Sequence, residues 1–142
     1  MALKIIDYET PEYQQMVKMR EEILRKPLGI AFTKEELEKD INNILIGAFD
    51  DDHMLGCCML VEETPDIVRL RQMAVLNDLQ GKGIGQALTL FAENIARDHG
   101  YKIMSMHGRK VIAGFFEKMG YKIKGDEFIE ITIPHYMMEK EL

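Results

Sequence analysis

The sequence predicts a mixed α/β fold, one domain over residues 1–142 whose elements follow the order β-α-α-β-β-β-α-β-α-β-β. Three observations lead to this prediction. Short apolar segments rich in β-branched residues alternate with amphipathic helical segments, which favours a sheet covered by helices. Strands of the first half are joined by short polar turns, which indicates antiparallel hairpins. A glycine-rich loop then separates a strand from a strongly amphipathic helix, as in a crossover connection.

Capping residues typical of helix N-termini predict two helices in the first half of the chain. The Thr10-Pro11 pair predicts a helix start, because threonine caps helix N-termini and proline fits the first turn. That helix is expected to stop near Pro27. Thr33 and Glu36 have the spacing of a capping box, which predicts a short second helix. The strands expected in this half are 3–8, 44–49, 54–62 and 67–76.

The second half is expected to open with a long helix that starts at Ile84 and stops at Gly100, because apolar residues recur at helical spacing up to that glycine. The last two strands are expected to be joined by a turn at Gly125 and Asp126. The elements expected after the long helix are strands at 101–107, 121–124 and 128–138 and a helix at 111–119.

Composition limits the classes of function. Apolar residues make up 46% and charged residues 30%, as in ordinary soluble domains. Eighteen basic against 24 acidic residues give a formal net charge of −6. This balance argues against a nucleic-acid partner, since phosphate affinity comes mostly from Lys and Arg. An acidic domain instead attracts cationic substrates such as amines.

The remaining compositional signals point to a cytoplasmic protein without metal. No apolar run approaches the ~20 residues that span a membrane, and the N-terminal residues do not resemble a secretory signal. Cys57 and Cys58 are adjacent on an expected strand and so point to opposite faces, which favours free thiols over a disulfide. No Cys/His spacing suggests a metal site, and we expect none.

The glycine-rich loop before the long helix is the most informative motif. Gly81, Gly83 and Gly85 leave the backbone without Cβ atoms where several N–H groups and a helix N-terminus can meet an anion. A Walker A loop needs Ser or Thr after its lysine, and here Gly83 follows Lys82. The dinucleotide fingerprint also fails, because its third glycine would fall on Gln86. The loop matches the pattern Q/R-x-x-G-x-G/A.

Neighbouring segments extend this pattern. The strand 70–76 leads directly into the loop, a segment G-F-F-E-K-M-G-Y occupies 114–121, and F-I-E-I-T-I-P-H-Y-M-M occupies 128–138. With these segments the chain resembles the GNAT superfamily of acetyl-CoA-dependent N-acetyltransferases over nearly its whole length. The ending is similar to that of small bacterial members. The resemblance implies a GNAT-like fold and acetyl-CoA as co-substrate.

The resemblance also implies positions for the cofactor. The pantetheine arm would lie where the strand before the loop splays from its neighbour at a bulge, and the loop amides would hold the pyrophosphate. His107 stands where family members commonly have an asparagine that contacts pantetheine. Arg109 and Lys110 are close enough to meet the 3′-phosphate or adenine, and are equally interpretable as surface charges. The cofactor residues implied are Met73, Ala74, Val75, Gln80, Gly81, Lys82, Gly83, Ile84, Gly85, Gln86, His107 and Arg109.

The catalytic acid of the family is missing. Members often place a tyrosine that protonates the CoA thiolate where this chain has Phe116, and Tyr121 aligns with a core position. The backbone N–H of Val75 is expected to polarise the thioester carbonyl.

A base is also required, because neutralising an alkyl ammonium at neutral pH costs about 4–5 kcal/mol. Glu62, Glu63, Glu130 and His135 are candidates, and His135 ranks first because imidazole titrates near neutrality. Pro134 removes a ladder donor and predicts that the strand ends in a bend that directs His135 to a specific place. Arg69 and Arg71 precede the cofactor strand and suit an acidic group on the substrate, or pair with surface carboxylates.

The function expected is acetyl transfer from acetyl-CoA to an amine of a small molecule or peptide, by direct attack. A non-catalytic acyl-CoA-binding regulator on the same fold is the alternative, favoured by Phe116. A small nucleotide-binding module is a third, which the failed phosphate-loop templates disfavour. A homodimer that pairs the C-terminal strands is compatible with the sequence.

Overall fold

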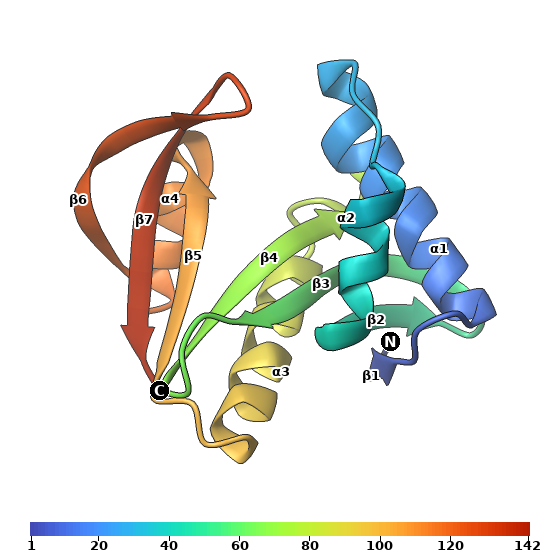
Figure 1. The fold of residues 1–142 in the computed structure, drawn as a ribbon, viewed down its shortest axis with the longest axis horizontal. Coiled ribbons are helices and arrows are strands. Elements are labelled where there is room, and N and C mark those ends of the chain that lie inside the picture. The colour runs from blue at the N-terminus through green and yellow to red at the C-terminus, as the bar shows by residue number, and fades with distance from the viewer.

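The computed structural model describes all 142 residues and contains one seven-stranded sheet with the strand order β1-β2-β3-β4-β5-β7-β6 (Figure 1). Neighbouring strands are antiparallel except for β4 and β5, which are parallel. This is the mixed α/β fold that the sequence predicts. The strands are β1 (Ala2–Ile6), β2 (Ile44–Asp50), β3 (His53–Glu62), β4 (Ile67–Val75), β5 (Ile103–Arg109), β6 (Lys122–Glu130) and β7 (Ile133–Glu141).

The helices follow the predicted order, with shorter α-helical cores. Thr10 caps the first helix and Pro11 opens it, and Thr33 and Glu36 form the predicted capping box. The first helix continues past its α-helical part as a π-helical turn at Glu21–Arg25 and a 3₁₀ turn at Lys26–Leu28. The α-helices are α1 (Pro11–Arg20), α2 (Lys34–Glu38), α3 (Ile84–Asp98) and α4 (Ala113–Lys118). Short 3₁₀ turns cover Lys39–Asn42, Asn77–Leu79 and Lys110–Ile112.

Each face of the sheet is covered by its own hydrophobic cluster. One lies between the sheet and helices α3 and α4, where Leu88 and Phe116 pack with Val68 and Met104. The other lies between the sheet and α1, where Met16 packs with neighbours that include Cys57. Both cysteines are buried free thiols, as the sequence predicts. In Figure 1, α1 and α2 lie over the β1–β4 side of the sheet and α3 lies behind it.

The sheet divides between β4 and β5. These strands pair only at Ile67–Ile103, Val68–Met104 and Arg69–Ser105, and beyond Arg69 they diverge (Figure 1). The register between β3 and β4 shifts here, because the step from Cys57 to Met59 on β3 matches three residues on β4. Gln72 lies inside this bulge with φ +55, a left-handed conformation that interrupts the extended strand. The bulge and the splay agree with the arrangement that the family resemblance implies.

The predicted turn at Gly125 and Asp126 is wrong. Residues 122–130 form one strand, and the register shift between Lys124 and Phe128 shows that these residues make a bulge. Gly125 has φ +79, so its conformational freedom serves the bulge. The reversal lies at Ile131 and Thr132, whose φ values of +47 and +63 form a two-residue hairpin turn.

The predicted strand end at Ile133–His135 is also wrong, since these residues begin β7. Pro134 pairs with Ile129 of β6, while the pairing with β5 ends at Arg109 opposite His135. The missing N–H of Pro134 therefore costs β5 no hydrogen bond. No helix in the structure is both long enough and apolar enough to cross a membrane.

Candidate functional site

A cleft of about 370 Å³ occupies the gap between β4 and β5. Its walls come from both faces of the sheet. Leu70, Met106 and Phe116 belong to the hydrophobic cluster on the α3/α4 side. Arg71 and Glu130 line the cleft from the opposite face. The gap therefore connects the two faces of the sheet where backbone pairing has ended.

Strand register assigns the polar side chains to that second face. Arg69 and Ser105 are neighbours in the parallel pair, and side chains two residues apart share a face. His107 and Arg109 of β5 therefore lie on the face of Ser105. Directly opposed residues also share a face, so the pairs Arg109–His135 and Phe128–His135 place the hairpin side chains there too. The polar set on this face is Arg69, Arg71, His107, Arg109, Glu130 and His135.

Within this set, Glu130 contacts two imidazoles. His107 Nδ1 lies 3.0 Å from Glu130 Oε1 and donates a hydrogen bond to it, while His135 Nε2 lies 3.7 Å from Glu130 Oε2. His135 Nδ1 donates to the carbonyl of Ile133 at 2.7 Å. The Phe128 ring stacks on His135 and meets the edge of His107. Both rings are thereby fixed in orientation.

The charge state of Glu130 follows from these contacts. Burial acts to raise the pKa of Glu130, but the His107 hydrogen bond and the positive charges near it, including Arg71, outweigh burial and lower the pKa. Glu130 is therefore a carboxylate at neutral pH. It holds His107 with Nδ1 protonated, so the neutral ring presents the lone pair of Nε2.

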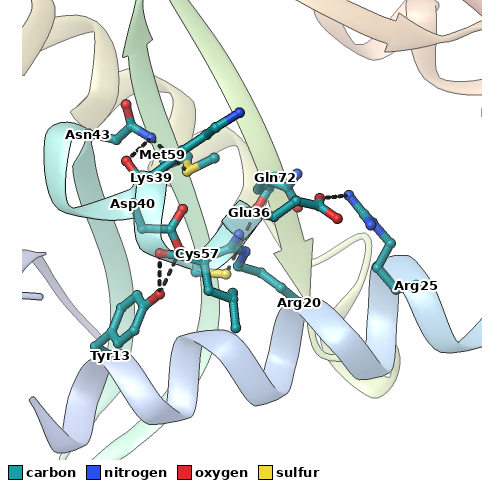
Figure 2. Close-up of polar contacts among 11 residues, drawn as sticks. Tyr13, Arg20, Arg25, Glu36, Lys39, Asp40, Asn43, Cys57, Met59 and Gln72 are labelled. Carbon is teal, nitrogen blue, oxygen red and sulfur yellow. Dashed lines mark hydrogen bonds and ion pairs between the residues drawn. The ribbon is translucent and has the colours of Figure 1, made fainter. Parts of the chain in front are cut away.

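Helix contacts fix the segment that closes the cleft on this face. Leu24, Arg25 and Leu28, which follow α1, line the cleft. Figure 2 shows how this segment is held: the Arg20 guanidinium and the Tyr13 hydroxyl both reach Asp40, at 2.8 and 2.7 Å. Arg25 Nη2 donates to Glu36 Oε2 at 2.9 Å, and the Phe32 ring lies against the guanidiniums of Arg20 and Arg25. Met16 and Met19 of α1 are buried in the core and do not line the cleft.

The glycine loop lies at the N-terminus of α3. Gly81 and Gly83 have φ of +80 and +87, and a Cβ on either would meet nothing within 4 Å, so open space lies beside the backbone. No turn, cap or side-chain hydrogen bond uses a backbone N–H of residues 80–86, and no side chain caps α3. These amides and the helix dipole suit an anion. The loop adjoins the cleft, because a Cβ on Gly85 would lie 3.6 Å from Sδ of Met73, a cleft residue.

Backbone groups of β4 also face the gap. The N–H of Leu76 donates to the carbonyl of Leu55 on β3 at 3.0 Å. Because hydrogen-bonded and non-bonded pairs alternate in antiparallel ladders, Val75 directs its N–H and carbonyl away from β3, toward the diverging β5. The Gln80 side-chain amide donates to the Val75 carbonyl at 3.2 Å. Gln80 thus braces the loop through its side chain.

The remaining predicted cofactor residues fall in several environments. Met73 lines the cleft, Ala74 is buried against the α1 side, and Ile84 packs its side chain into the α3 side of the core. Lys82 and Gln86 are exposed beside the loop. The structure brings His107 and Arg109 into the cleft on the face opposite α3, away from the glycine loop. Lys110 pairs with Glu127 at 2.7 Å on the surface.

The three glutamates considered as alternative bases differ in their position relative to the cleft. Glu62 accepts from Tyr101 at 2.7 Å, and Glu63 accepts from Ser105 at 3.0 Å and pairs with Arg69. Neither glutamate lines the cleft. Only Glu130 among the candidate carboxylates does so.

The structure also shows where Phe116 and Tyr121, the two aromatic residues considered for the catalytic acid, lie. Phe116 lines the cleft and packs edge-on against Tyr121. Tyr121 is buried in the core and its hydroxyl donates to Glu93 at 2.8 Å, as the core interpretation predicts. No tyrosine lines the cleft, so its walls offer no phenolic acid.

Sequence reasoning missed the pairing of His107 with Glu130. It treated His107 as a cofactor contact and Glu130 as an isolated candidate. The signal that finds the pair is the hairpin register, because a turn at residues 131 and 132 places Glu130 beside the strand that flanks β5. A turn predicted at Gly125 instead of Ile131 does not reveal that Glu130 lies near His107.

Comparison with known proteins agrees with this architecture. A model of the acetyltransferase (GNAT) domain family matches residues 10–142. The chain is 29% identical over 108 residues to the uncharacterized protein YyaT of Bacillus subtilis, a match that spans 76% of this chain and 71% of YyaT. It is 33% identical over 69 residues to the uncharacterized N-acetyltransferase CT2212 of Chlorobaculum tepidum, spanning 49% of this chain and 43% of that protein.

Solved structures show the same fold. Escherichia coli ElaA superposes with a TM-score of 0.85 at 15% identity, over 99% of this chain and 100% of ElaA. An aminoglycoside 6′-N-acetyltransferase complexed with coenzyme A superposes with a TM-score of 0.83 at 17% identity, over 99% of this chain and 97% of that one. With the family match covering nearly the whole sequence, this chain belongs to the GNAT family of acetyltransferases.

Proposed function

We propose that this protein transfers an acetyl group from acetyl-CoA to the amine of a small molecule or peptide. The observation that carries the proposal is the cleft through the sheet, with a glycine loop of unpaired amides beside one end and a carboxylate–imidazole pair on the other face. Acetyl transfer to an amine needs both: a place for a phosphate-bearing thioester and a base for an ammonium.

The residues around the loop fit coenzyme A. The unpaired amides of residues 81–86 and the α3 N-terminus suit a pyrophosphate. Ile112 and Phe115 are exposed apolar residues, and Phe115 lies beside the loop, because a Cβ on Gly85 would lie 3.8 Å from its Cζ. Met73 and the outward backbone groups of Val75 continue this path into the gap, where an amide-containing arm can pair with β4 as a further strand would. A structural relative agrees, since the aminoglycoside 6′-N-acetyltransferase is complexed with coenzyme A.

When bound, acetyl-CoA supplies the thioester whose carbonyl carbon accepts the amine. The Val75 N–H polarises the carbonyl oxygen. His107 takes the proton from the amine at Nε2, while Glu130 stabilises the resulting imidazolium. The C–N bond forms as the C–S bond breaks, and the thiolate takes its proton from water. No covalent intermediate on the protein is needed, and both cysteines are buried away from the cleft.

The sequence ranked His135 first as base, and that remains the competing assignment. His135 is more enclosed, with 9% of its side chain exposed against 24% for His107. Its Nδ1 is committed to the Ile133 carbonyl and its Nε2 faces Glu130. We therefore assign His135 a structural role, through its Nδ1 hydrogen bond to Ile133 and the Phe128 ring stacked on it.

The experiment is release of free thiol from acetyl-CoA across a panel of amines, with mass spectrometry of the products. We expect acetylated amine in equal amount to the thiol released. A second function, a non-catalytic acyl-CoA-binding regulator, is favoured by Phe116 at the position of the usual acid. Tight acetyl-CoA binding in calorimetry without turnover on any amine would support that function against the transferase.

A further inference from the structure

We propose that the acceptor amine carries an anionic group, a carboxylate or a phosphate, which Arg71 and Arg109 bind on the cleft face that holds Glu130 and the two histidines. This inference rests on the proposed acetyl transfer and names the class of its acceptor.

The charge of the cleft is the first observation. The protein has a formal net charge of −6, which by itself favours cationic substrates. The cleft has the opposite character, because four arginines line it and Glu130 is its only carboxylate. A substrate that brought only an ammonium group would approach a site where positive charges outnumber negative ones.

Two of these arginines already have partners. Arg25 Nη2 lies 2.9 Å from Glu36 Oε2, and Arg69 Nε pairs with Glu63. Arg71 and Arg109 make no ion pair or side-chain hydrogen bond in the structure. Each guanidinium carries five donors, and a planar oxygen pair or a phosphate satisfies them best. Arg71 and Arg109 are therefore the two arginines of the cleft that are available to bind a ligand.

Their placement on either side of the gap is the second observation. Arg71 belongs to β4 just before the bulge, and Arg109 ends β5, opposite His135. The strands diverge between them. An acceptor lying across this face can present its anionic group to Arg71 and Arg109 while its amine meets His107.

The same arrangement helps the chemistry. Cationic surroundings disfavour an ammonium and so favour the neutral amine, which is the form that attacks. Burial and the charges of Arg69, Arg25 and Arg20 also lower the pKa of Arg71, with Glu130 acting in the opposite direction. An anion bound at Arg71 would offset the repulsion that these three guanidiniums exert on Arg71.

Arg109 has a competing role, since the family resemblance placed it near the cofactor phosphates. The face assignment separates the two roles. The glycine loop adjoins α3, whereas Arg109 shares the opposite face with Glu130 and His135. If Arg109 bound the cofactor, its removal would raise KM for acetyl-CoA and leave KM for the acceptor unchanged.

The test compares matched acceptors. One arm pairs α-amino acids with their carboxamides, which keep the size and lose the negative charge. The other pairs phosphoethanolamine with ethanolamine. We expect kcat/KM to be higher by about tenfold or more for the anionic member of at least one pair, and the arm that shows it identifies the anion. Arg71→Gln and Arg109→Gln should each raise KM for that acceptor by about tenfold and leave its neutral partner and KM for acetyl-CoA within about twofold.

Lys122→Gln is the matched control. It removes one positive charge from exposed β6 outside the cleft, and should leave every constant unchanged. Equal kcat/KM for anionic and neutral members, or equal losses with both in the arginine variants, would overturn the inference while acetyl transfer stands.

Failure of the transferase itself gives a different pattern. If no amine turns over, the proposed function is wrong, and the inference is then decided by binding alone. N-acetylated amino acids and their carboxamides, titrated into the protein with coenzyme A present, should differ in affinity in the wild type and become equal in Arg71→Gln. Equal affinities already in the wild type would overturn the inference.

Discussion

Glu130 of β6 accepts a hydrogen bond from His107 of β5 at 3.0 Å, although 22 residues separate them and β7 lies between their strands. The hairpin turn at Ile131 brings the carboxylate over β7 to reach that ring. The lowered pKa of Glu130 keeps it ionised at neutral pH, so the imidazole has a permanent negative neighbour. Catalysis by this pair predicts a specific pH dependence of kcat/KM and specific effects of substitution at each histidine.

His107→Gln should lower kcat/KM by about 10²-fold, because it removes the proposed base for the amine proton. The wild-type pH–rate profile should carry a basic limb, and His107→Gln should remove it. Protonation of Glu130 should add no limb near neutrality, because its pKa lies below the usual 4.5.

His135→Gln is the matched comparison for that experiment. We expect a loss of about 1 kcal/mol in urea unfolding, from the hydrogen bond to Ile133, with rates within a few-fold. A pH–rate profile that loses its limb in His135→Gln and keeps it in His107→Gln would reverse the two assignments.

Gly83→Val should weaken acetyl-CoA binding by about tenfold or more, at least ~1.4 kcal/mol. Gly83 has φ +87, so valine both strains the backbone and covers the amides beside it. Gly100→Val is the control, since Gly100 has φ +86 in equally open space at the other end of α3. Calorimetry should show weaker binding in Gly83→Val alone. Equal affinity in the two folded variants would remove the loop from the cofactor site.

Phe116→Tyr should preserve or raise kcat. Phe116 lines the cleft, so a hydroxyl there can protonate the leaving thiolate in place of water. Phe91→Tyr adds the same hydroxyl on α3, outside the cleft, and should leave kcat unchanged. A tenfold fall in kcat in folded Phe116→Tyr would show that the position must be apolar and would favour the regulator.

Asp40→Asn should destabilise the protein by about 3–5 kcal/mol, because it leaves the Arg20 guanidinium buried without a counter-charge. Tyr13→Phe should cost about 1 kcal/mol through the lost hydrogen bond, and the two effects should be non-additive because both act on Asp40. Urea unfolding measures them. Glu38→Gln, which breaks an exposed pair with Lys34, serves as control and should change stability little. A small effect of Asp40→Asn would show that the segment over the cleft is held by other contacts.

Stability should fall above pH ~8.5, where the thiols of the unfolded chain ionise. Burial raises the pKa of Cys57 to about 12, against the opposing effects of Arg20 and a backbone hydrogen bond from Ala74, and burial raises that of Cys58 well above its usual value. A raised folded pKa contributes stability that is complete below the unfolded pKa and is lost as pH rises. We expect a loss of about 1–1.5 kcal/mol per thiol between pH ~8 and ~9.5.

Cys57→Ala and Cys58→Ala should each flatten that pH dependence. The comparison belongs below pH ~10, because the buried hydroxyls of Tyr13 and Tyr121 also have raised pKa values and contribute at higher pH. Unfolding curves of the variants that run parallel to the wild type would contradict the thiol account.

Local signals made most of the fold predictable. Thr10, Pro11 and the Thr33–Glu36 box act within a single turn, so the sequence reveals them directly. The C-terminal hairpin was not predictable in the same way. Its turn uses Ile131 and Thr132, β-branched residues that rarely adopt positive φ, whereas Gly125 and Asp126 are typical turn residues placed in a bulge.

The site shows the same division. The glycine loop is a local motif, and the six-residue pattern at 80–85 predicts its position at the start of α3. The pair of His107 and Glu130 depends on strand order and register, which involve long-range pairing across β7. A one-residue slip would turn Glu130 to the other face, so no propensity argument could establish the pair.

The short pairing of β4 with β5 has a mechanical consequence. Strands β1–β4 and strands β5, β7 and β6 share only three residue pairs, from Ile67–Ile103 to Arg69–Ser105. We expect a backbone ladder this short to act as a hinge, about which the two parts of the sheet tilt and change the width of the gap. Amide hydrogen exchange would then report two cooperative blocks of protection that meet at Arg69, with a molecule held in the gap slowing both.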